Sequence, residues 1–181
     1  MTRLRESVLL RRPVQVECIP DGNQIELEEG TWGQLTQALG SSFTQVVEGQ
    51  MVRLKGSDAD AIGKPVPVAP TAPTDLGRDG VHDLVWQTLK TCYDPEIPVD
   101  IVELGLVYVC DVIPIDDEQV RVSIKMTLTA PGCGMGEVLA EEIAEKVMAL
   151  PRVADVNVEF VFDPPWDRSR MSEAAQLMLG L

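Results

Sequence analysis

A proline-rich stretch at residues 64–78 divides this chain of 181 residues into two parts. The stretch, KPVPVAPTAPTDLGR, holds four of the thirteen prolines and shows no apolar periodicity. Proline removes a backbone donor and favours extended, polyproline-like backbone, so such a segment connects folded units. We therefore predict a small domain at 1–63, a linker at 64–78 and a second domain at 79–181.

The first part has the pattern of short β-strands. Apolar and polar residues alternate over 14–18 and again over 25–27, with a turn sequence between them. Segments 42–49 and 51–56 predict a further hairpin, while 31–40 is compatible with either one helical turn or another strand. A small, mostly β domain, built as a barrel or a sandwich, follows from this pattern.

The second part combines helical and strand periodicities. Apolar residues recur at helical spacing from about 80 to 92, with Asp79 as a possible cap. Residues 104–113 form a nearly continuous β-prone run. Alternation from Val120 to Leu128 predicts a half-buried strand whose polar positions, Thr127 included, face away from the core.

A second helix and a last strand complete the second part. Leu139, Ile143, Val147 and Leu150 recur at helical spacing, and residues 156–160 alternate again. The order helix, strand, strand, helix, strand predicts a two-layer α-β-β-α-β sandwich of the α+β class. The final residues of the chain predict a short terminal helix or turn.

Charge and hydropathy exclude several classes of function. The formal net charge is −14 and the pI is about 4.4, so a phosphate backbone would be repelled and we expect no nucleic acid as partner. The apolar run Val8 to Leu10 is too short for a signal peptide or a membrane span. We therefore expect a cytoplasmic protein without a membrane partner.

Four cysteines are scattered through the chain without any C-x-x-C pair. This spacing argues against a disulfide framework and against a self-contained zinc site. Cys92 completes an apolar helical stripe and Cys110 lies in a predicted buried strand, so we expect both to be structural, and Cys18 likewise. A bound metal would therefore need ligands from outside this chain.

The fourth cysteine lies in the glycine-rich loop TAPGCGMG, residues 129–136, which leaves a strand and enters a helix. Glycines permit close backbone approach, and a thiol at a helix N-terminus is favoured as the thiolate that binds metals. Thr129, Gly132, Cys133 and Gly134 are therefore candidates for holding an anion or a metal cluster, with Cys133 as metal ligand. Alternatively, the glycines only shape a tight connection and Cys133 is a buried filler.

Two carboxylates flank Pro95 where the first helix stops. Asp94 and Glu96 could act on a proton, a metal or a partner's amide, or they could simply belong to a helix-terminating turn. His82, the only histidine, is expected to be a solvated helix residue. Trp166 either anchors the tail against its own domain or contacts a partner.

Three motifs now give a specific resemblance. DPEIPVDIVELGLVY (94–108), MTLTAPGCGMG (126–136) and FDPPWDRSRMSEAAQLMLGL (162–181) resemble the SufT family of iron-sulfur assembly proteins, whose metal-sulfur cluster biosynthesis domain is shared with eukaryotic cytosolic iron-sulfur targeting factors. Residues 36–64 are similar to the longer SufT form.

The resemblance implies an accessory role in iron-sulfur cluster assembly or delivery to client proteins, with Cys133 as the functional residue, and no enzymatic activity. One thiolate cannot fill the four-thiolate shell of a cluster, so a transient cluster would be shared between chains, or none is held stably. Expected partners are iron-sulfur scaffold, carrier or client proteins and a second copy of the chain. The alternatives are a thiol enzyme with Cys133 as nucleophile and a metal-free scaffold or adaptor.

Overall fold

The computed structural model describes residues 6–39, 41–67, 77–94, 97–130 and 135–181. Contacts within the chain divide it into two compact units, the first centred on residues 1–69 and the second spanning most of 70–181. Most of the predicted linker, residues 68–76, lies outside the described residues. The predicted domain boundaries therefore stay a prediction.

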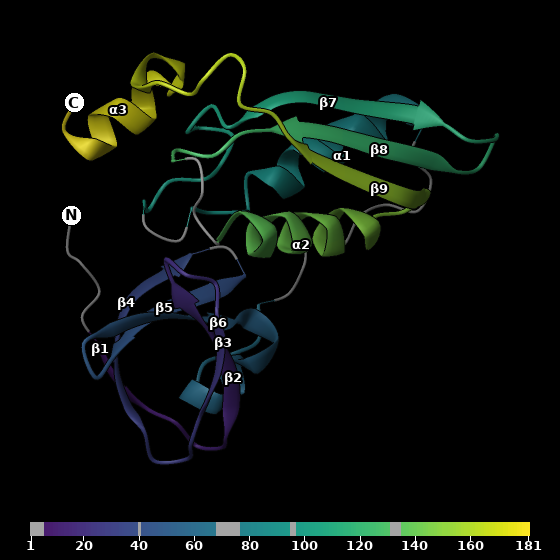
Figure 1. Cartoon of the computed structure of the whole chain (residues 1–181). Helices are drawn as coiled ribbons and strands as arrows, with labels where there is room; N and C mark the ends of the chain where they lie inside the picture. The colour runs from purple at the N-terminus through teal and green to yellow at the C-terminus, as the bar shows by residue number, and fades with distance from the viewer. Residues whose placement is uncertain (1–5, 40, 68–76, 95–96, 131–134) are drawn as a thin grey trace. The chain divides into compact units, whose positions relative to one another are not determined.

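The first unit is a six-stranded antiparallel sheet that curves around its core (Figure 1). The strand order is β1-β4-β5-β6-β2-β3. The strands and the 3₁₀ helix that follows them are β1 (Glu6–Leu9), β2 (Val14–Ile19), β3 (Gln24–Leu27), β4 (Trp32–Leu39), β5 (Ser42–Val47), β6 (Gln50–Lys55) and η1 (Gly56–Ile62). The predicted mostly β domain is confirmed, and its ambiguous segment 31–40 contains strand β4.

Turn chemistry and alternation explain these hairpins. Glu48 and Gly49 both have positive φ, 51° and 86°, the backbone that a two-residue hairpin turn between β5 and β6 requires. Inward-facing apolar residues of the strands and of η1 then share one core. Its buried members are Val8, Leu10, Val14, Val16, Cys18, Leu35, Phe43, Val47, Val52, Leu54, Ala59, Ala61 and Ile62.

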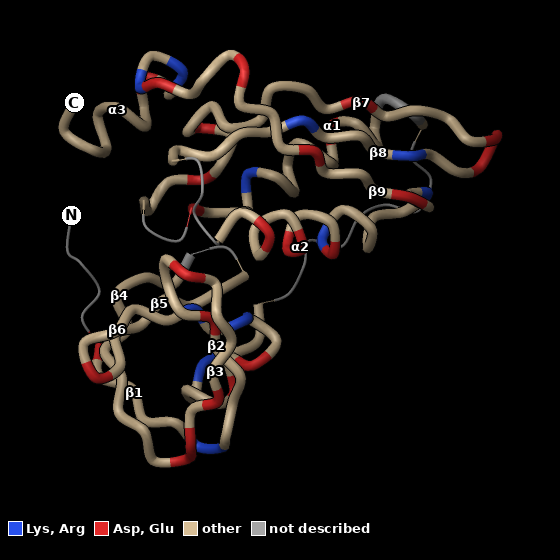
Figure 2. Tube along the Cα trace, viewed as in Figure 1, with Lys and Arg blue, Asp and Glu red and all other residues tan. Residues whose placement is uncertain are grey.

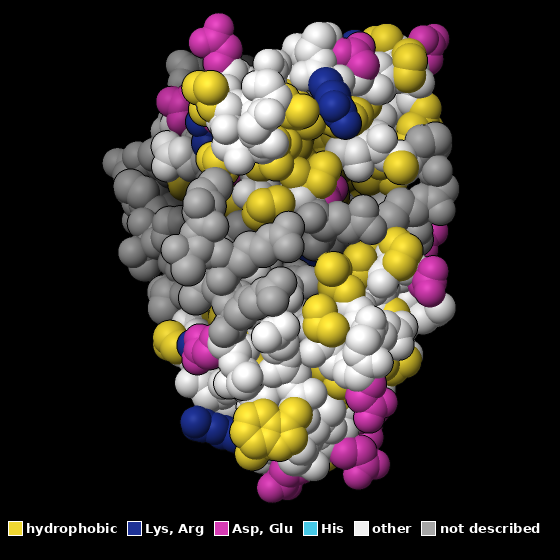
Figure 3. Space-filling view, turned by 90° about the vertical axis from the view of Figure 1, so that its left-hand side faces the viewer, with side chains coloured by type: hydrophobic (Ala, Val, Ile, Leu, Met, Phe, Trp, Pro, Cys, Tyr) yellow, Lys and Arg dark blue, Asp and Glu magenta, His cyan; other side chains and the backbone are white. Residues whose placement is uncertain are grey.

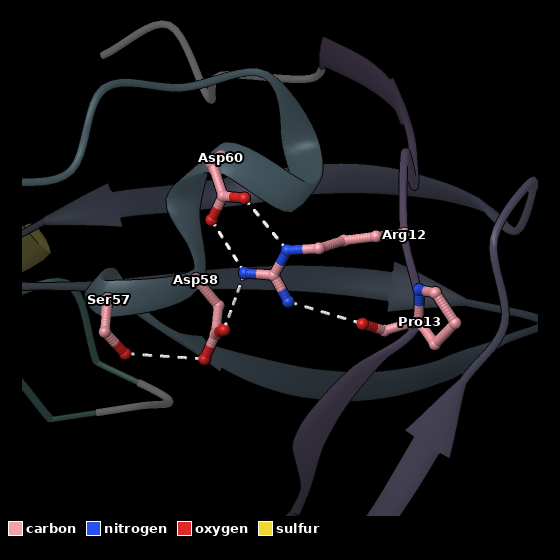
Figure 4. Close-up of polar contacts among 5 residues, drawn as sticks. All are labelled: Arg12, Pro13, Ser57, Asp58 and Asp60. Carbon is pink, nitrogen blue, oxygen red and sulfur yellow. Dashed lines mark hydrogen bonds and ion pairs between the residues drawn. The ribbon is translucent and has the colours of Figure 1, made fainter.

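Arg12 fastens η1 to the chain between β1 and β2. Its guanidinium donates to both carboxylate oxygens of Asp60, at 2.9 and 2.7 Å, and to Asp58 at 2.8 Å (Figure 4). The hydrogen bonds from Arg12 hold the pKa of Asp60 below its usual range. These ion pairs hold η1 to the segment before β2, and because they are largely exposed they contribute little to stability.

Polar side chains are also buried in the first unit. Glu17 and Arg53 face each other across β2 and β6 at 3.5 Å, with both side chains at most 6% exposed. Gln45 is 1% exposed, and neither its amide nitrogen nor its amide oxygen has a hydrogen-bond partner in the described chain. An ideal Cβ on Gly33 would stand 2.6 Å from Gln45 Oε1, so a larger residue there would force the end of the glutamine side chain to shift.

The second unit packs helices on a three-stranded sheet of order β7-β8-β9, as the α+β prediction requires. Figure 1 shows α2 running alongside one face of this sheet. The elements are α1 (Arg78–Leu89), β7 (Val107–Pro114), β8 (Val120–Met126), α2 (Met135–Met148), β9 (Val153–Phe160), η2 (Arg168–Arg170) and α3 (Glu173–Leu179). β7 and β8 are antiparallel, whereas β8 and β9 are parallel.

Two predicted boundaries in this unit are wrong. The first helix begins at Arg78 after the N-cap Gly77, so Asp79 lies inside it, and it ends at Leu89, before Cys92. The first strand begins at Val107 because Gly105, at φ 68°, reverses the chain and Leu106 N donates to Ile101 O at 2.9 Å. An apolar run therefore spans a turn and a strand.

Candidate functional site

The segment that leads to the predicted cysteine loop leaves the sheet at one well-defined end. Met126, the last residue of β8, pairs with Val107 on one side and with Phe160 on the other. Beyond it, Thr127 N donates to Leu106 O at 2.9 Å, and Val161 N donates to Met126 O at 2.8 Å. The ends of three strands therefore frame the exit of the chain toward α2.

The first turn of α2 packs close to this end. An ideal Cβ on Gly136 would stand 2.8 Å from Leu128 Cδ1 and 3.6 Å from Phe160 Cζ. A side chain at position 136 would therefore force the end of the Leu128 side chain to move. This close approach gives Gly136 a packing role, while the roles predicted for the other loop residues stay a prediction.

The predicted site residues fall into two groups. Gly132, Cys133, Gly134 and Glu96 lie outside the described residues, so their assignment to a site stays a prediction. Thr129 is half-buried in the bend after β8, and Asp94 is buried, with its backbone N donating to Val99 O at 3.2 Å.

Thr127 differs from the prediction that placed it on the exposed face. It is 1% exposed, and its hydroxyl has no hydrogen-bond partner in the described parts of the chain. β8 ends at Met126, so the simple alternation of strand faces no longer applies one residue later. A buried polar group thus lies six residues before Cys133, and no periodicity in the sequence could have revealed it.

The turn after α1 is held by Asp100. Its Oδ1 accepts from Val102 N and Glu103 N, both at 3.0 Å, and Tyr93 pairs with Asp100 in an isolated antiparallel bridge. Burial raises the pKa of Asp100, while these two backbone donors oppose the shift. Burial and the negative Asp100 together raise the pKa of Tyr93. The turn positions Asp94 and the start of β7.

Lys146 ties α2 to the end of α1, a contact that the sequence analysis missed. Its Nζ donates to Thr91 O at 2.8 Å, lies 3.6 Å from Cys92 Sγ and pairs with Glu142 at 2.8 Å. The i, i+4 spacing of Glu142 and Lys146 could have indicated the ion pair. Nothing local in the sequence indicates the contacts with Thr91 and Cys92, which lie more than fifty residues away.

Three of the four cysteines have the structural role that was predicted. Cys18, Cys92 and Cys110 are 2%, 0% and 9% exposed, and none of the three forms a disulfide within the described chain. Burial, with a smaller contribution from Asp111, raises the pKa of the Cys110 thiol to about 11, which disfavours the thiolate. Within the described ranges, no three His, Cys, Asp or Glu side chains form a group that could hold a metal ion.

The remaining candidates have local partners. His82 Nε2 accepts from Trp86 Nε1 at 3.1 Å, one helical turn away on α1. Trp166 Nε1 donates to Leu104 O at 2.8 Å, and the side chain is half-buried. The tryptophan therefore anchors the C-terminal segment against its own unit, the first of the two roles predicted for it.

Comparison with known proteins decides the family. The sequence pattern of the iron-sulfur cluster assembly protein family matches residues 82–160. The Fe-S protein maturation auxiliary factor YitW of Bacillus subtilis is 38% identical over 104 residues, which are 58% of this chain and 98% of that protein. The chain belongs to the iron-sulfur cluster assembly protein family. The resemblance predicted from three motifs is confirmed.

A second relative and a solved structure are similar to this chain as well. The Fe-S protein maturation auxiliary factor SufT of Staphylococcus aureus is 41% identical over 88 residues, 49% of this chain and 96% of that protein. The crystal structure of a DUF59 domain of unknown function from Bacillus anthracis covers 57% of this chain and 95% of its own, with a TM-score of 0.50 and 34% identity. Since these proteins match between 49% and 58% of this chain, the similarity of residues 36–64 to the longer SufT form stays a prediction.

Proposed function

We propose that this protein is a non-enzymatic accessory factor that supports iron-sulfur cluster assembly or delivery to client proteins through Cys133. One observation supports this most: the three described cysteines of a cluster-assembly family member are all buried. Their thiols are withheld from solvent, and Cys133 is the cysteine left to act as a thiolate. The relatives of this protein are named maturation auxiliary factors, which agrees with an auxiliary role.

The number of cysteine ligands that one chain supplies favours a cluster that is bound only transiently. Protein-bound clusters are commonly held by four thiolates, whereas Cys133 supplies one per chain. Neither the described carboxylates nor the buried thiols assemble a set of three ligands. We therefore propose that the cluster is cargo, shared transiently between two chains, with exogenous thiols filling the two remaining positions of the shell.

Of the charged and polar groups at the start of α2, some favour an anionic ligand and one opposes it. Met135 begins α2, so the backbone N–H groups and the positive end of the helix dipole favour negative charge just before it. Glu137 in the first turn opposes this effect. Thr129, Gly132 and Gly134 would contact the ligand. We propose that Asp94 and Glu96, from the connection between α1 and β7, are further polar groups of the same site.

The single imidazole weighs against a thiol enzyme. Thiol enzymes commonly pair cysteine with histidine. His82 is the only histidine in the sequence, and its Nε2 already accepts a hydrogen bond from Trp86. A carboxylate base such as Asp94 would have to replace it.

Partners and location follow from composition. The proposed partners are iron-sulfur scaffold, carrier or client proteins and a second copy of this chain, and nucleic acid is disfavoured. Lys and Arg are interspersed among more numerous Asp and Glu along both units (Figure 2). No helix in the described residues is long and apolar enough to cross a bilayer. We propose that the protein acts in the cytoplasm.

Anaerobic reconstitution with ferrous iron and sulfide tests the proposal. Wild type should gain visible charge-transfer absorption and bound iron, Cys133→Ala should gain neither, and the matched control Cys110→Ala should behave as wild type. If Cys133→Ala binds as much iron and sulfide as wild type, the proposed ligand is wrong.

A further inference from the structure

The C-terminal segment 162–181 is firmly attached to the second unit. Trp166 Nε1 donates to Leu104 O at 2.8 Å, and Ser172 N donates to Glu103 O at 2.9 Å. These bonds come from opposite ends of the 3₁₀ turn η2, so the segment is held at two points. The exposed side chains of segment 162–181 therefore have fixed positions on the surface of the second unit.

Helix α3 and the residues beside it are buried on one side and exposed on the other. Ala175 is fully buried and Met171, before the helix, is 6% exposed, whereas Leu177 and Met178 are 78% and 46% exposed and Leu181, after the helix, is 55% exposed. We name these three residues the C-terminal stripe. Figure 3 shows hydrophobic side chains gathered on the side of the second unit that carries α3. Exposed apolar side chains gathered on one side of a unit are a mark of interaction sites.

We infer that the C-terminal stripe is the surface on which a second copy of this chain docks. Charge supports this occupant. The whole chain carries −14, yet residues 162–181 hold three acidic and two basic residues, a net charge of −1. Two copies of so acidic a protein repel each other least where their surfaces are nearly neutral. A stripe of leucine and methionine is also self-complementary across a two-fold axis.

The position of the stripe connects it to the proposed function, on which this step rests. Val161 N bonds to Met126 O, so the C-terminal segment leaves the sheet at the same end from which the chain departs toward Cys133. A two-fold contact through the C-terminal segment would bring two copies together at the end of the sheet where residues 127–130 leave β8. The second copy would thus complete a site that one chain leaves incomplete.

Salt dependence distinguishes this contact from a charge-driven one. At an ionic strength of about 0.15 M the Debye length is about 8 Å, so repulsion between two acidic chains is largely screened. The dimer is therefore expected to tighten as salt rises from about 10 to about 150 mM. Capture of a basic partner would weaken over the same range.

Sedimentation of the full-length protein tests the interface. Wild type should be dimeric at micromolar concentration, and Leu177→Glu should raise the dissociation constant at least tenfold. Leu177→Lys should do the same, because apolar burial rather than charge drives association. The matched control Ile115→Glu, at a residue 50% exposed in the β7–β8 turn, should dimerise as wild type.

Two results would overturn the inference. One is a wild-type monomer throughout the micromolar range, and the other is a dimer that Ile115→Glu breaks and Leu177→Glu leaves intact. Cys133→Ala separates this inference from the proposed function. It should remain a dimer without binding iron, and a monomeric Cys133→Ala would count against the stripe as the docking surface. Wild type that dimerises but binds no iron would reject the proposed function alone.

Discussion

Replacement of Gly105 by alanine is expected to destabilise the second unit far more than the same change at Gly180. Both glycines have positive φ, 68° and 75°, so alanine incurs the left-handed backbone cost of about 1–2 kcal/mol at each. At Gly105 the new Cβ would also stand 2.2 Å from Arg170 O and 2.8 Å from Arg170 C. At Gly180 no atom lies within 4 Å.

The difference between the two variants isolates the clash. Overpacking against backbone typically adds about 1–3 kcal/mol, so we expect a loss of about 3 kcal/mol for Gly105→Ala and about 1 kcal/mol for Gly180→Ala. Urea denaturation followed by far-UV circular dichroism measures both. Amide exchange at Ser172, bonded to Glu103 O, should accelerate in Gly105→Ala alone because the C-terminal segment must move away. Equal losses in the two variants would refute the packing of Arg170 over Gly105.

Three further predictions concern single groups and the division of the chain. Gln45→Met, which removes an unsatisfied buried amide at similar volume, should leave the free energy of unfolding unchanged or raise it by up to about 1 kcal/mol in thermal denaturation, and a clear loss would show that the amide is satisfied. Because the folded pKa of Cys110 is raised from 9.0 to about 11, its contribution to stability is complete below pH 9 and is lost as pH rises to about 11. Wild type should therefore lose about 2–3 kcal/mol across this range that Cys110→Val does not lose, and parallel pH profiles of the two would contradict the shift. A fragment of residues 79–181 should fold alone and keep the alkylation rate of Cys133, whereas an insoluble fragment would argue that both halves fold as one cooperative unit.

Periodicity predicted those elements whose own sequence contains the decisive pattern. Alternation in β8 and the helical spacing in α2 each bury one face against the other layer, so the amino-acid pattern alone indicates element and orientation. The β5–β6 hairpin was equally visible, because its turn and both strands are contiguous in the chain.

Elements that depend on distant partners were not predictable in the same way. β1 is four residues long and exists because Glu6–Leu9 pairs with β4, more than twenty residues later. The segment 31–40 was ambiguous for the same reason, since its strand is supported by β1 on one side and β5 on the other. The first strand of the second unit was drawn too long because an apolar run does not reveal the reversal at Gly105.

The candidate site shows the same limit. Burial of Cys92 and Cys110 followed from the apolar residues around each, and the structure agrees. The contact of Lys146 with Thr91 depends on tertiary packing, and so does the burial of Thr127. Local sequence thus predicted which cysteines are buried, while the contacts of Lys146 and the burial of Thr127 could be found only from the fold.

Replacement of the cellular copy by Cys133→Ser measures the central claim most directly. The activity of iron-sulfur enzymes, assayed beside enzymes without clusters, should fall in cells carrying Cys133→Ser and stay at the wild-type level in cells carrying Cys110→Ala at equal abundance. Full iron-sulfur enzyme activity in the Cys133→Ser cells, under conditions in which deletion of the gene lowers it, would contradict a role for Cys133 in cluster delivery.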